Sequence, residues 1–579
     1  MKNWCGKATT IKEIKIDGSV YSEPKRIAEE LNKHFSTLGA RLESEIPQSI
    51  NKPVDYLEPT NSNFHLAPIS SENVLRLLSK LCTSKATGLD KISAKLLKTA
   101  APAISSSLTH IFNTMIIKGI FPDDLKKARV IPIFKDDKRN NPNNYRPISV
   151  LPVVARIFEK IVFDQLYNYL SRNDLLTKTQ SGFRPLHSTL TTLLKSTDIW
   201  LSNIDEKLLN GVLFLDLKKA FDTVEHEILL FKLAYYGVSE NSLAFFNSYL
   251  QSRVQHCCVN GVLSGPQNVT HGVPQGSVLG PLHFLIYVND LPNCLDSAVP
   301  SMYADDTNVT VSSNNVSNLE GQLNHELDNI NEWLKANRLS INQTKTEFMI
   351  ISSRHCLLNI EREPTVSLGD VPLSRVQTKK CLGLIIDEHL GWSPHIDLVI
   401  KKACNGLKAL RRCRSFVPRE TLLGIYNSLV RPYFDYCASV WGKCDKGLRD
   451  KIQILQNQGA KILTRASYDS SSTEALKLAG WSPLEQNRLI QEALMMFKIY
   501  NQLAPDYLSD MFIRSNERHN YSLRNSDTNF ILPFPHTEAG KRRFSYHGAH
   551  LWNSLPSDIK AAPSIDSFKD RINKYFSIN

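Results

Sequence analysis

The stretch Tyr303-Ala304-Asp305-Asp306 decides how this sequence is interpreted. Apolar residues on both sides of it alternate with polar or small ones, which predicts two short strands joined by a turn. A solvated turn tolerates two adjacent carboxylates, because aspartate is a common turn residue. A divalent cation such as Mg²⁺ would offset their repulsion, because hard cations bind carboxylate oxygens. Taken alone, the pair favours the solvated turn.

A third acid, Asp216, changes that balance. It stands near the end of a predicted strand, Gly211 to Leu217, and a helix from Lys218 to Tyr236 is expected to follow it, closed by Gly237. Asp216 can cap this helix, or it can complete a metal site with the hairpin acids, and both roles can hold together. Two ions roughly 3.5–4 Å apart can activate an attacking hydroxyl and neutralise a leaving oxygen in phosphoryl transfer.

Together with the stretch from Phe214 to His226, the acid pair resembles the catalytic motifs of a reverse transcriptase. Four further stretches agree, and they follow the order of that family. They are Gly182-Phe183-Arg184-Pro185, Gly272-Val273-Pro274-Gln275-Gly276-Ser277, Lys345-Thr346-Glu347 and Cys381-Leu382-Gly383. In detail the chain is most similar to the polymerases of non-LTR retrotransposons (LINE type, jockey and chicken-repeat-like). The similarity is close from Leu66 to Asp387 and looser toward the C-terminus.

The resemblance implies that Asp216, Asp305 and Asp306 bind two catalytic Mg²⁺ ions, which Mn²⁺ can replace, with the Leu217 carbonyl as a further ligand. In the family, one ion lowers the pKa of the primer 3′-hydroxyl and the other holds the triphosphate of the incoming nucleotide. Asp305 is expected to be the firmer ligand of the pair. Lys345 occupies the position of a lysine that protonates the departing pyrophosphate. As an isolated lysine it would be a solvated charge.

The resemblance also implies a set of nucleotide-binding residues. Phe221, expected in the first turn of the helix after the first acid, would block a ribose 2′-hydroxyl; otherwise it is a core aromatic. Gln275 and Gly276 would pack beside the incoming base and the template, because glycine permits close approach of the backbone; otherwise they form an ordinary turn. Arg146 and Arg184 would hold the triphosphate, since guanidinium matches phosphate geometry, or they are solvated arginines.

Two later segments resemble parts of the family that hold the primer and template. Gly383, in a strand expected from Cys381 to Ile386, is similar to the grip on the primer end. The basic helical segment from His395 to Arg414 resembles the polymerase thumb, whose cations follow the nucleic-acid backbone. The alternative for this segment is a solvated helix face.

The composition bounds the class of protein. The 579 residues exceed one hydrophobic core, and a hydrophobic content of 42% with 22% charged residues excludes a disordered chain. Lys and Arg exceed Asp and Glu by 69 − 57 = 12, which suits a polyanionic partner. The 11 scattered cysteines form no CxxC pair, which predicts a reduced intracellular protein, nuclear or cytoplasmic, without a zinc finger. No apolar run is long enough to span a bilayer.

The expected fold is α+β, arranged as a right-hand polymerase: helical fingers, a palm with an antiparallel sheet, a helical thumb and a mostly helical C-terminal extension. The expected domains are an N-terminal extension (1–65), fingers with the start of the palm (66–210), palm (211–387), thumb (388–470) and C-terminal extension (471–579). Expected partners are an RNA template, a DNA primer or target and deoxynucleoside triphosphates, with no membrane. Because complete elements usually carry an endonuclease, the chain is expected to be the polymerase half of a longer element.

Local patterns give further expectations. A strand pair around Asp17-Gly18 precedes a helix from Pro24 to Leu42. A helix from Ser93 to Lys118 is expected to break at Pro102. Lys135 to Asn144 forms a basic loop that ends in Tyr145-Arg146-Pro147-Ile148-Ser149.

Two other functions stay open from sequence. The first is a catalytically silent, transposon-derived protein that binds RNA without polymerising; a damaged acid would mark it, and all three acids are intact. The second is an RNA-templated RNA polymerase with a related palm. Phe221 argues against it, because an enzyme that admits ribonucleotides is expected to carry a small residue there.

Overall fold

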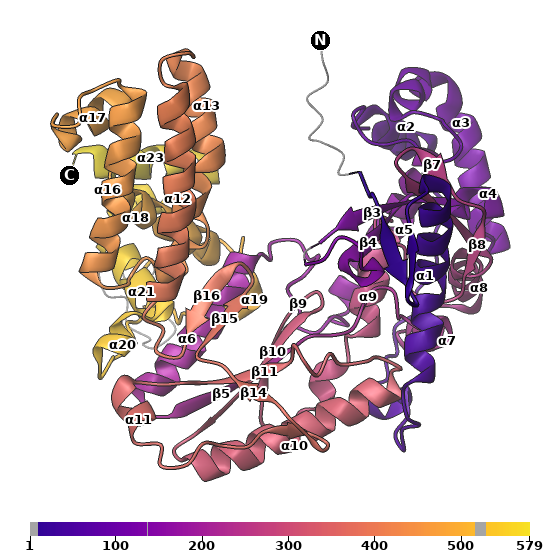
Figure 1. Ribbon diagram of the computed structural model, residues 1–579, viewed down its shortest axis with the longest axis horizontal. Coiled ribbons are helices and arrows are strands. Elements are labelled where there is room, and N and C mark those ends of the chain that lie inside the picture. The colour runs from indigo at the N-terminus through magenta and orange to yellow at the C-terminus, as the bar shows by residue number, and fades with distance from the viewer. Residues whose placement is uncertain (1–9, 136, 516–527, 579) are drawn as a thin grey trace. The chain divides into compact units, whose positions relative to one another are not determined.

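The computed structural model describes residues 10–135, 137–515 and 528–578, which form two compact units. Unit 1 consists of the described residues up to Phe183, with Asp216–Asp296 and Leu327–Asn342. Unit 2 consists of Arg184–Leu215, Ser297–Glu326 and the described residues from Gln343 onward. Residues 1–9 of the expected N-terminal extension, residue 136 of the expected basic loop and residues 516–527 of the expected C-terminal extension lie outside the described residues. Both units mix helices with sheets, as the sequence predicts (Figure 1).

Unit 1 opens with the expected strand pair and helix, β1 (Ile14–Ile16), β2 (Ser19–Tyr21) and α1 (Pro24–Ser44). The turn between the strands uses Asp17 and Gly18, both at positive φ, as the Asp-Gly pair predicts. The other helices of this unit are η1 (Pro53–Tyr56), α2 (Ser71–Ser79), α3 (Ala94–Lys118), α4 (Asp123–Lys126), η2 (Pro142–Asn144), α5 (Val153–Arg172), α7 (His226–Tyr235), α8 (Glu240–Leu250), α9 (Leu279–Tyr287) and η3 (Leu291–Cys294).

The sheet of unit 1 has the order β4-β3-β6-β7, with β8 also paired to β6. Its strands are β3 (Ala128–Phe134), β4 (Tyr145–Val150), β6 (Arg253–Val259), β7 (Val262–Leu263) and β8 (Gln267–Val269). One core lies between this sheet and α1: Ile27 and Leu31 from the helix are buried with Val130 and Val259 from the strands. Burial of this apolar surface, worth about 25 cal/mol per Å², fixes α1 on the sheet.

Two expectations about this part of the chain are wrong. α3 runs unbroken through Pro102, which lies on the exposed side of the helix while Ala101 and Phe112 are buried. The packing of the buried face outweighs the hydrogen bond that proline cannot donate. Tyr145–Val150 is strand β4 and not the end of a loop. It is the outer strand of its sheet, which is where a proline such as Pro147 is tolerated.

The helix expected from Lys218 starts only at His226. Glu225 is its N-cap, and the Glu225 carboxylate accepts hydrogen bonds from the backbone amides of Glu227 and Ile228. Lys219 has φ 52°, in the left-handed region that interrupts a helix. Asp216 therefore caps no helix, and Phe221 lies in the turns that precede α7 and not in a first helical turn.

The sheet of unit 2 has the order β14-β11-β5-β10-β9 (Figure 1). Its strands are β5 (Leu209–Leu215), β9 (Val299–Tyr303), β10 (Asp306–Ser313), β11 (Glu347–Ile351) and β14 (Ser374–Arg375). β5 is central and all seven of its residues are buried. It pairs antiparallel with β10 from Leu209 opposite Ser313 to Leu215 opposite Thr307. Helix α6 (Thr189–Asp205) packs against β5 and β9.

The strand expected from Cys381 to Ile386 is instead two strands, β15 (Thr378–Cys381) and β16 (Leu384–Asp387). Leu382 and Gly383 form the turn between them, both at positive φ. The remaining elements are α10 (Val316–Ala336), α11 (Arg354–Leu358), β12 (Ser367–Leu368), β13 (Val371–Pro372), α12 (Ser393–Cys413), α13 (Arg419–Leu429), α14 (Arg431–Asp435), α15 (Ala438–Trp441), α16 (Lys446–Leu463), α17 (Ser472–Ala479), α18 (Leu484–Tyr500), α19 (Asp506–Ser509), α20 (Glu538–Lys541), α21 (Phe544–Ser554), α22 (Ser557–Lys560) and α23 (Ile565–Ile578).

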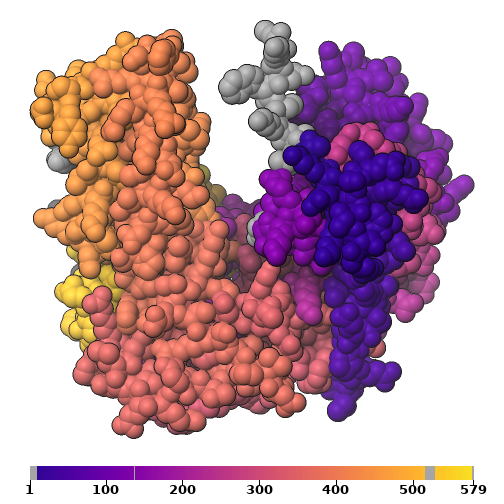
Figure 2. Space-filling view, viewed as in Figure 1, coloured from indigo at the N-terminus to yellow at the C-terminus, as the bar shows by residue number. Residues whose placement is uncertain are grey.

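The helices of unit 2 from α12 onward pack around large buried aromatic side chains. Trp441 lies in a core shared by α12, α13 and α16, and Trp552 lies in a second core with α18 and α23. The orange surface in Figure 2 belongs to the helices between α12 and α17. Within the described ranges, no helix is long and apolar enough to cross a membrane.

Candidate active site

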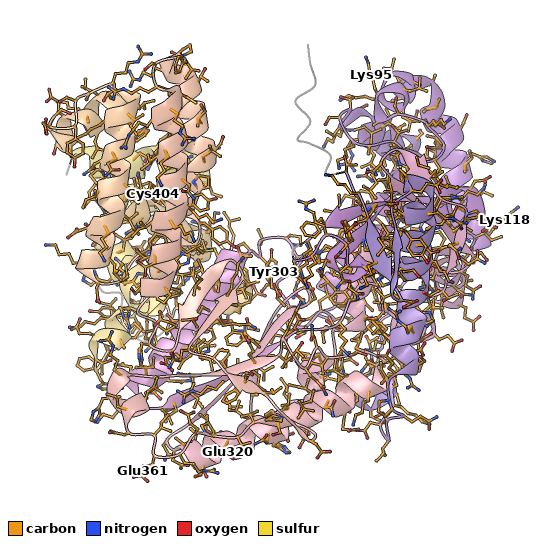
Figure 3. All side chains as sticks on the ribbon, viewed as in Figure 1. Lys95, Lys118, Tyr303, Glu320, Glu361 and Cys404 are labelled. Atoms are coloured by element: carbon orange, nitrogen blue, oxygen red, sulfur yellow. The ribbon has the colours of Figure 1, made fainter. Side chains whose placement is uncertain are left out.

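The acid pair stands at the turn between β9 and β10, as the alternation of residues predicts (Figure 3 labels Tyr303). Tyr303 and Asp306 are the last paired residues, so Ala304 and Asp305 form the turn. Ala304 is buried and has φ 58°, a conformation that costs an L-residue about 1 kcal/mol. Asp305 and Asp306 are exposed. Among the described residues, none donates a hydrogen bond to the Asp305 carboxylate or forms an ion pair with it.

Asp216 belongs to unit 1 and is held by the segment Ser340–Asn342. The Asn342 amide donates to the Asp216 carbonyl (2.7 Å), and the Asn342 side chain donates from Nδ2 to Asp216 Oδ2 (2.9 Å). Lys218 N donates to the Ser340 carbonyl in turn. Because residues 216 and 218 make these bonds, the carbonyl of Leu217 between them points away from the segment.

Carboxylate oxygens are the donors that Mg²⁺ prefers, so the chemistry of these acids fits a magnesium site. Asp305 and Asp306 belong to unit 2, whereas Asp216 belongs to unit 1. In the part of the chain that the structure describes, no three or more His, Cys, Asp or Glu side chains are gathered closely enough to hold a metal ion.

Phe221 is part of an aromatic cluster in unit 1. Its ring stacks on Phe284 with the centroids 4.4 Å apart, and it meets the ring of Phe183 edge-on at 6.1 Å. The Phe221 carbonyl accepts a hydrogen bond from the amide of Val273 (2.8 Å), which joins Phe221 to the loop that carries Gln275. Phe183 and Phe284 lie far from Phe221 in sequence, in the Gly182–Pro185 motif and in an apolar helix, so no local pattern predicts that they contact it.

Gln275 and Gly276 lie in the same unit as Phe221 and have defined contacts. The Gln275 side chain donates from Nε2 to Asp222 Oδ1 (2.8 Å), and its carbonyl accepts from the amide of Ser149 (2.7 Å). Gly276 has φ 118°, and a Cβ there would lie 2.6 Å from the Ser149 carbonyl oxygen, so only glycine fits. Gln275 is therefore held between β4 and Asp222.

Asp222 is a residue of this site that the sequence interpretation missed. Its second oxygen, Oδ2, is buried without a hydrogen-bond partner among the described residues. Asp222 and Gln275 both line a cavity of about 40 Å³. Burial raises the pKa of the Asp222 carboxyl to about 6, although the hydrogen bond from Gln275 opposes that change. An acid one residue after Phe221 in a quoted stretch was the only signal available.

Comparison with known proteins identifies this region. Residues 133–386 match the family described as reverse transcriptase (RNA-dependent DNA polymerase). This region is a reverse transcriptase domain. It contains the acid pair, Asp216, Phe221 and Gln275, so the resemblance on which their expected roles rest is confirmed at the level of the family.

Relatives of the reverse transcriptase domain come from insect mobile elements. The chain is 28% identical over 453 residues to the "Probable RNA-directed DNA polymerase from transposon BS" of Drosophila melanogaster. These aligned residues cover 75% of this chain and 49% of the relative. It is 30% identical over 438 residues to the "RNA-directed DNA polymerase from mobile element jockey" of the same species, covering 73% of this chain and 46% of the relative. The chain thus spans about half the length of the curated relatives it matches. The predicted similarity to jockey-type elements is confirmed.

Three further predicted site residues of the reverse transcriptase domain lie in different segments of the chain. Lys345 is exposed just before β11, and its carbonyl accepts a hydrogen bond from Lys379 Nζ (3.2 Å). Arg146 is exposed on β4 of unit 1. Arg184 is half-buried and is the first residue of unit 2.

Gly383 and its surroundings form a compact turn in unit 2. A Cβ on Gly383 would lie 2.9 Å from the ring of Tyr436, whose hydroxyl donates to the Leu382 carbonyl (2.7 Å). Tyr436, which the sequence interpretation missed, thus holds the β15–β16 turn against the helices that follow. One of these is α12, whose basic residues are exposed while Ala403 and Leu407 are buried. The cations of its exposed face are Lys401, Lys402, Lys408, Arg411 and Arg412.

The stability of the Asp222→Asn reverse transcriptase domain relative to that of the wild type is expected to be greater at neutral pH than at acid pH. The folded-state pKa of Asp222 is raised from 3.8 to about 6, so protonation favours the folded wild type at low pH, and that contribution is lost as the pH rises through about 6. Asparagine keeps the acceptor for Gln275 and carries no charge. Between pH 5 and pH 8, the difference in the free energy of unfolding between the two proteins, measured with urea, should change by about 1–2 kcal/mol.

The matched control for this measurement is Asp174→Asn, because the Asp174 side chain is 77% exposed in the same unit. This variant measures the effect of the same Asp-to-Asn change at an exposed position. Parallel curves for Asp222→Asn and the wild type would show that Asp222 does not titrate in this range.

Proposed function

We propose that the chain is an RNA-directed DNA polymerase of the non-LTR retrotransposon type, which adds deoxynucleotides to a primer 3′-hydroxyl by two-metal phosphoryl transfer. The observation that carries this proposal is the register of β5 and β10, which pair as far as Leu215 and Thr307. Asp216 follows Leu215 directly and Asp306 precedes Thr307 directly. Both acids are therefore attached to the same end of one strand pair, next to the exposed turn at Asp305.

In this proposal Asp216, Asp305 and Asp306 hold two Mg²⁺ ions, or Mn²⁺ in their place, and the Leu217 carbonyl is a further ligand. Bound ions would make the primer 3′-hydroxyl more acidic and neutralise charge on the phosphates. The contribution of the chain is to fix the ligands. The two hydrogen bonds from Asn342 orient Asp216, and the β9–β10 turn presents Asp305 to solvent, where substrates arrive.

The base and the sugar of the nucleotide would lie against residues of unit 1. Phe221, stiffened by its stacking on Phe284, would occupy the space that a ribose 2′-hydroxyl requires. Gln275, oriented by Asp222, and Gly276 would pack beside the base and the template. Arg146 and Arg184 would bind the triphosphate, and Lys345 would donate a proton to the departing pyrophosphate.

We also infer the right-hand arrangement of fingers (66–210), palm (211–387) and thumb (388–470), with 1–65 and 471–579 as extensions. The five-stranded sheet of unit 2 supports the palm, and the exposed cations of α12 support a thumb that binds an RNA template and a DNA primer. Binding of this kind depends on phosphate charge and is therefore weakened by salt.

The decisive experiment is a primer extension assay. The purified full chain, given an oligo(dT) primer on poly(rA), dTTP and Mg²⁺, is expected to extend the primer. Absence of extension across a range of Mg²⁺ and Mn²⁺ concentrations would overturn the proposal. If such a protein still bound the template, the alternative of a catalytically silent, transposon-derived RNA-binding protein would replace it.

Phe221→Val is expected to admit ribonucleotides. Valine removes the ring that stacks on Phe284 and leaves room for a 2′-hydroxyl, so the ratio of kcat/KM for UTP to that for dTTP should rise about 10- to 100-fold. Single-nucleotide addition on the same primer and template measures both values. Phe231→Val, at an exposed phenylalanine of α7, is the matched control and should leave the ratio unchanged. Equal ratios in Phe221→Val and the wild type would remove Phe221 from this role.

A further inference from the structure

Arg488 of α18 is a buried cation that forms no hydrogen bond with the part of the chain that the structure describes. The residue is 8% exposed, and its Nε and Nη2 atoms have no partner among the described residues. Its guanidinium carbon lies 4.6 Å from the centroid of the Trp441 ring. A cation–π contact contributes about 0.5–2 kcal/mol, which is less than the several kcal/mol that burial of an unpaired charge costs. The site therefore favours an additional negatively charged group.

The guanidinium lines a small cavity in unit 2, between α15, α16 and α18 (Figure 1 labels α16 and α18). The cavity volume is about 20 Å³, enough for one water molecule or one phosphate oxygen. A Cβ on Gly442 would lie 3.0 Å from Arg488 Cδ, so glycine at this position leaves room for the arginine. The side chains of Lys443 and Arg449, which also line the cavity, are 38% and 32% exposed, and they mark the side on which it opens.

The charges around the cavity do not balance. Three cations line it (Lys443, Arg449 and Arg488) and two carboxylates (Glu485 and Glu492), which leaves 3 − 2 = 1 positive charge. Glu485 accepts from Arg449 (2.9 Å), and Glu492 lies 3.7 Å from Lys443. Glu492 also accepts a hydrogen bond from His547, whose pKa is lowered well below its usual value by burial, so this histidine adds no charge. Arg488 has the charges of Glu485 and Asp435 nearby but donates a hydrogen bond to neither among the described residues, so the surplus positive charge of the lining is assigned to it.

We propose that this cavity binds one phosphate group of a nucleic-acid strand, with an oxygen on the Arg488 guanidinium and with Lys443 and Arg449 at the mouth. A phosphodiester carries one negative charge, which equals the surplus of the site. Its oxygens accept the parallel N–H bonds that a guanidinium offers. A buried water molecule would satisfy the N–H groups but would leave the charge uncompensated. The choice of a nucleic acid as the source of the phosphate rests on the proposed function.

The test uses the full chain and the variant Arg488→Met, which keeps an unbranched apolar stem over Trp441 and removes the charge. Affinity for a labelled primer–template is measured between 50 and 300 mM KCl. One phosphate contact contributes about 0.7–0.9 to the slope of log K against log salt, so the variant should lose that amount. In a second measurement, inorganic phosphate at constant ionic strength should raise the Tm of the wild type and leave that of the variant unchanged.

The matched control is Arg514→Met. Arg514 lies over the ring of Tyr500 at 4.7 Å, but it donates a hydrogen bond to the Tyr500 carbonyl and lines no part of this cavity. Its salt slope and its response to phosphate should equal those of the wild type. If the salt slope of Arg514→Met fell by the same amount as that of Arg488→Met, the assignment of the phosphate contact to Arg488 would be overturned.

The outcomes separate the possible occupants. Equal slopes and equal phosphate responses in the wild type and Arg488→Met would overturn the proposal and leave a cavity that holds water. A phosphate response that is lost in the variant while the slope is unchanged would overturn the nucleic acid as the source and leave a site for free phosphate. If the wild type extends primers but its salt slope equals that of Arg488→Met, this proposal is overturned and the polymerase function is not. If binding of the primer–template depends on Arg488 but no primer is extended, the polymerase function is overturned and this proposal is not.

Discussion

Asp305→Asn is expected to lower the rate of primer extension by at least about 1,000-fold, equivalent to about 4 kcal/mol of transition-state stabilisation. Asp305 is a turn residue between β9 and β10, is exposed, and has no described partner whose loss would disturb the fold. Asparagine is a common turn residue and keeps the shape of the side chain. What the substitution removes is one carboxylate charge from the proposed metal site. The expected effect therefore falls on catalysis and not on stability.

The measurement is steady-state extension of oligo(dT) on poly(rA), together with thermal unfolding to show that the variant is folded. Asp370→Asn is the matched control, because Asp370 is an exposed aspartate in the short turn between β12 and β13 of the same unit. It should extend primers at the wild-type rate. Asp306→Asn is expected to lose less activity than Asp305→Asn. An Asp305→Asn protein that retained a tenth or more of the wild-type rate would contradict the assignment of Asp305 as a metal ligand.

Local features of the fold were predictable from sequence because their causes are local. The alternation of residues around Asp305 predicts the β9–β10 hairpin, and the Asp-Gly pair predicts the β1–β2 turn, since both depend on neighbours within a few residues. The contact between Phe221 and the loop that carries Gln275 has no such local cause. Their contact crosses about fifty residues of sequence, which no periodicity reveals.

Where prediction failed, a nonlocal or competing interaction decided the structure. Apolar spacing after Asp216 suits a helix, but the left-handed Lys219 and the cap at Glu225 delay it until His226. Pro147 suggests a loop, yet an outer strand accepts it. Asp222 looks like any polar residue until its buried hydrogen bond with Gln275 is seen.

The described residues from 528 to 578, which the sequence predicts to belong to a C-terminal extension, are bound through two buried carboxylates of α6. Asp205 accepts hydrogen bonds from the amides of His536 (3.0 Å) and Thr537 (2.7 Å) and from the Thr537 hydroxyl (2.6 Å). Asp198, two helical turns earlier on the same face of α6, accepts from the amide and the hydroxyl of Ser545 (2.8 and 2.9 Å). α6 lies within the matched reverse transcriptase domain, whereas these partners lie beyond its last matched residue, 386. The extension is thus part of the packing of unit 2.

Asp205→Ala is expected to lower the free energy of unfolding by about 3 kcal/mol, because three donors lose a charged acceptor at once. Burial alone would raise the pKa of Asp205, but the hydrogen bonds from Thr537 and His536 lower it, so its contribution is present above the ordinary aspartate range and is lost in acid. Urea unfolding at pH 7 measures the loss, and limited proteolysis should cut the residues after 535 first. Glu206→Ala, at the exposed neighbouring position, is the control and should change stability by less than about 0.5 kcal/mol. Equal stability of the two variants would mean that the extension is held by its apolar contacts, such as those of Trp552, and that the carboxylate contributes little.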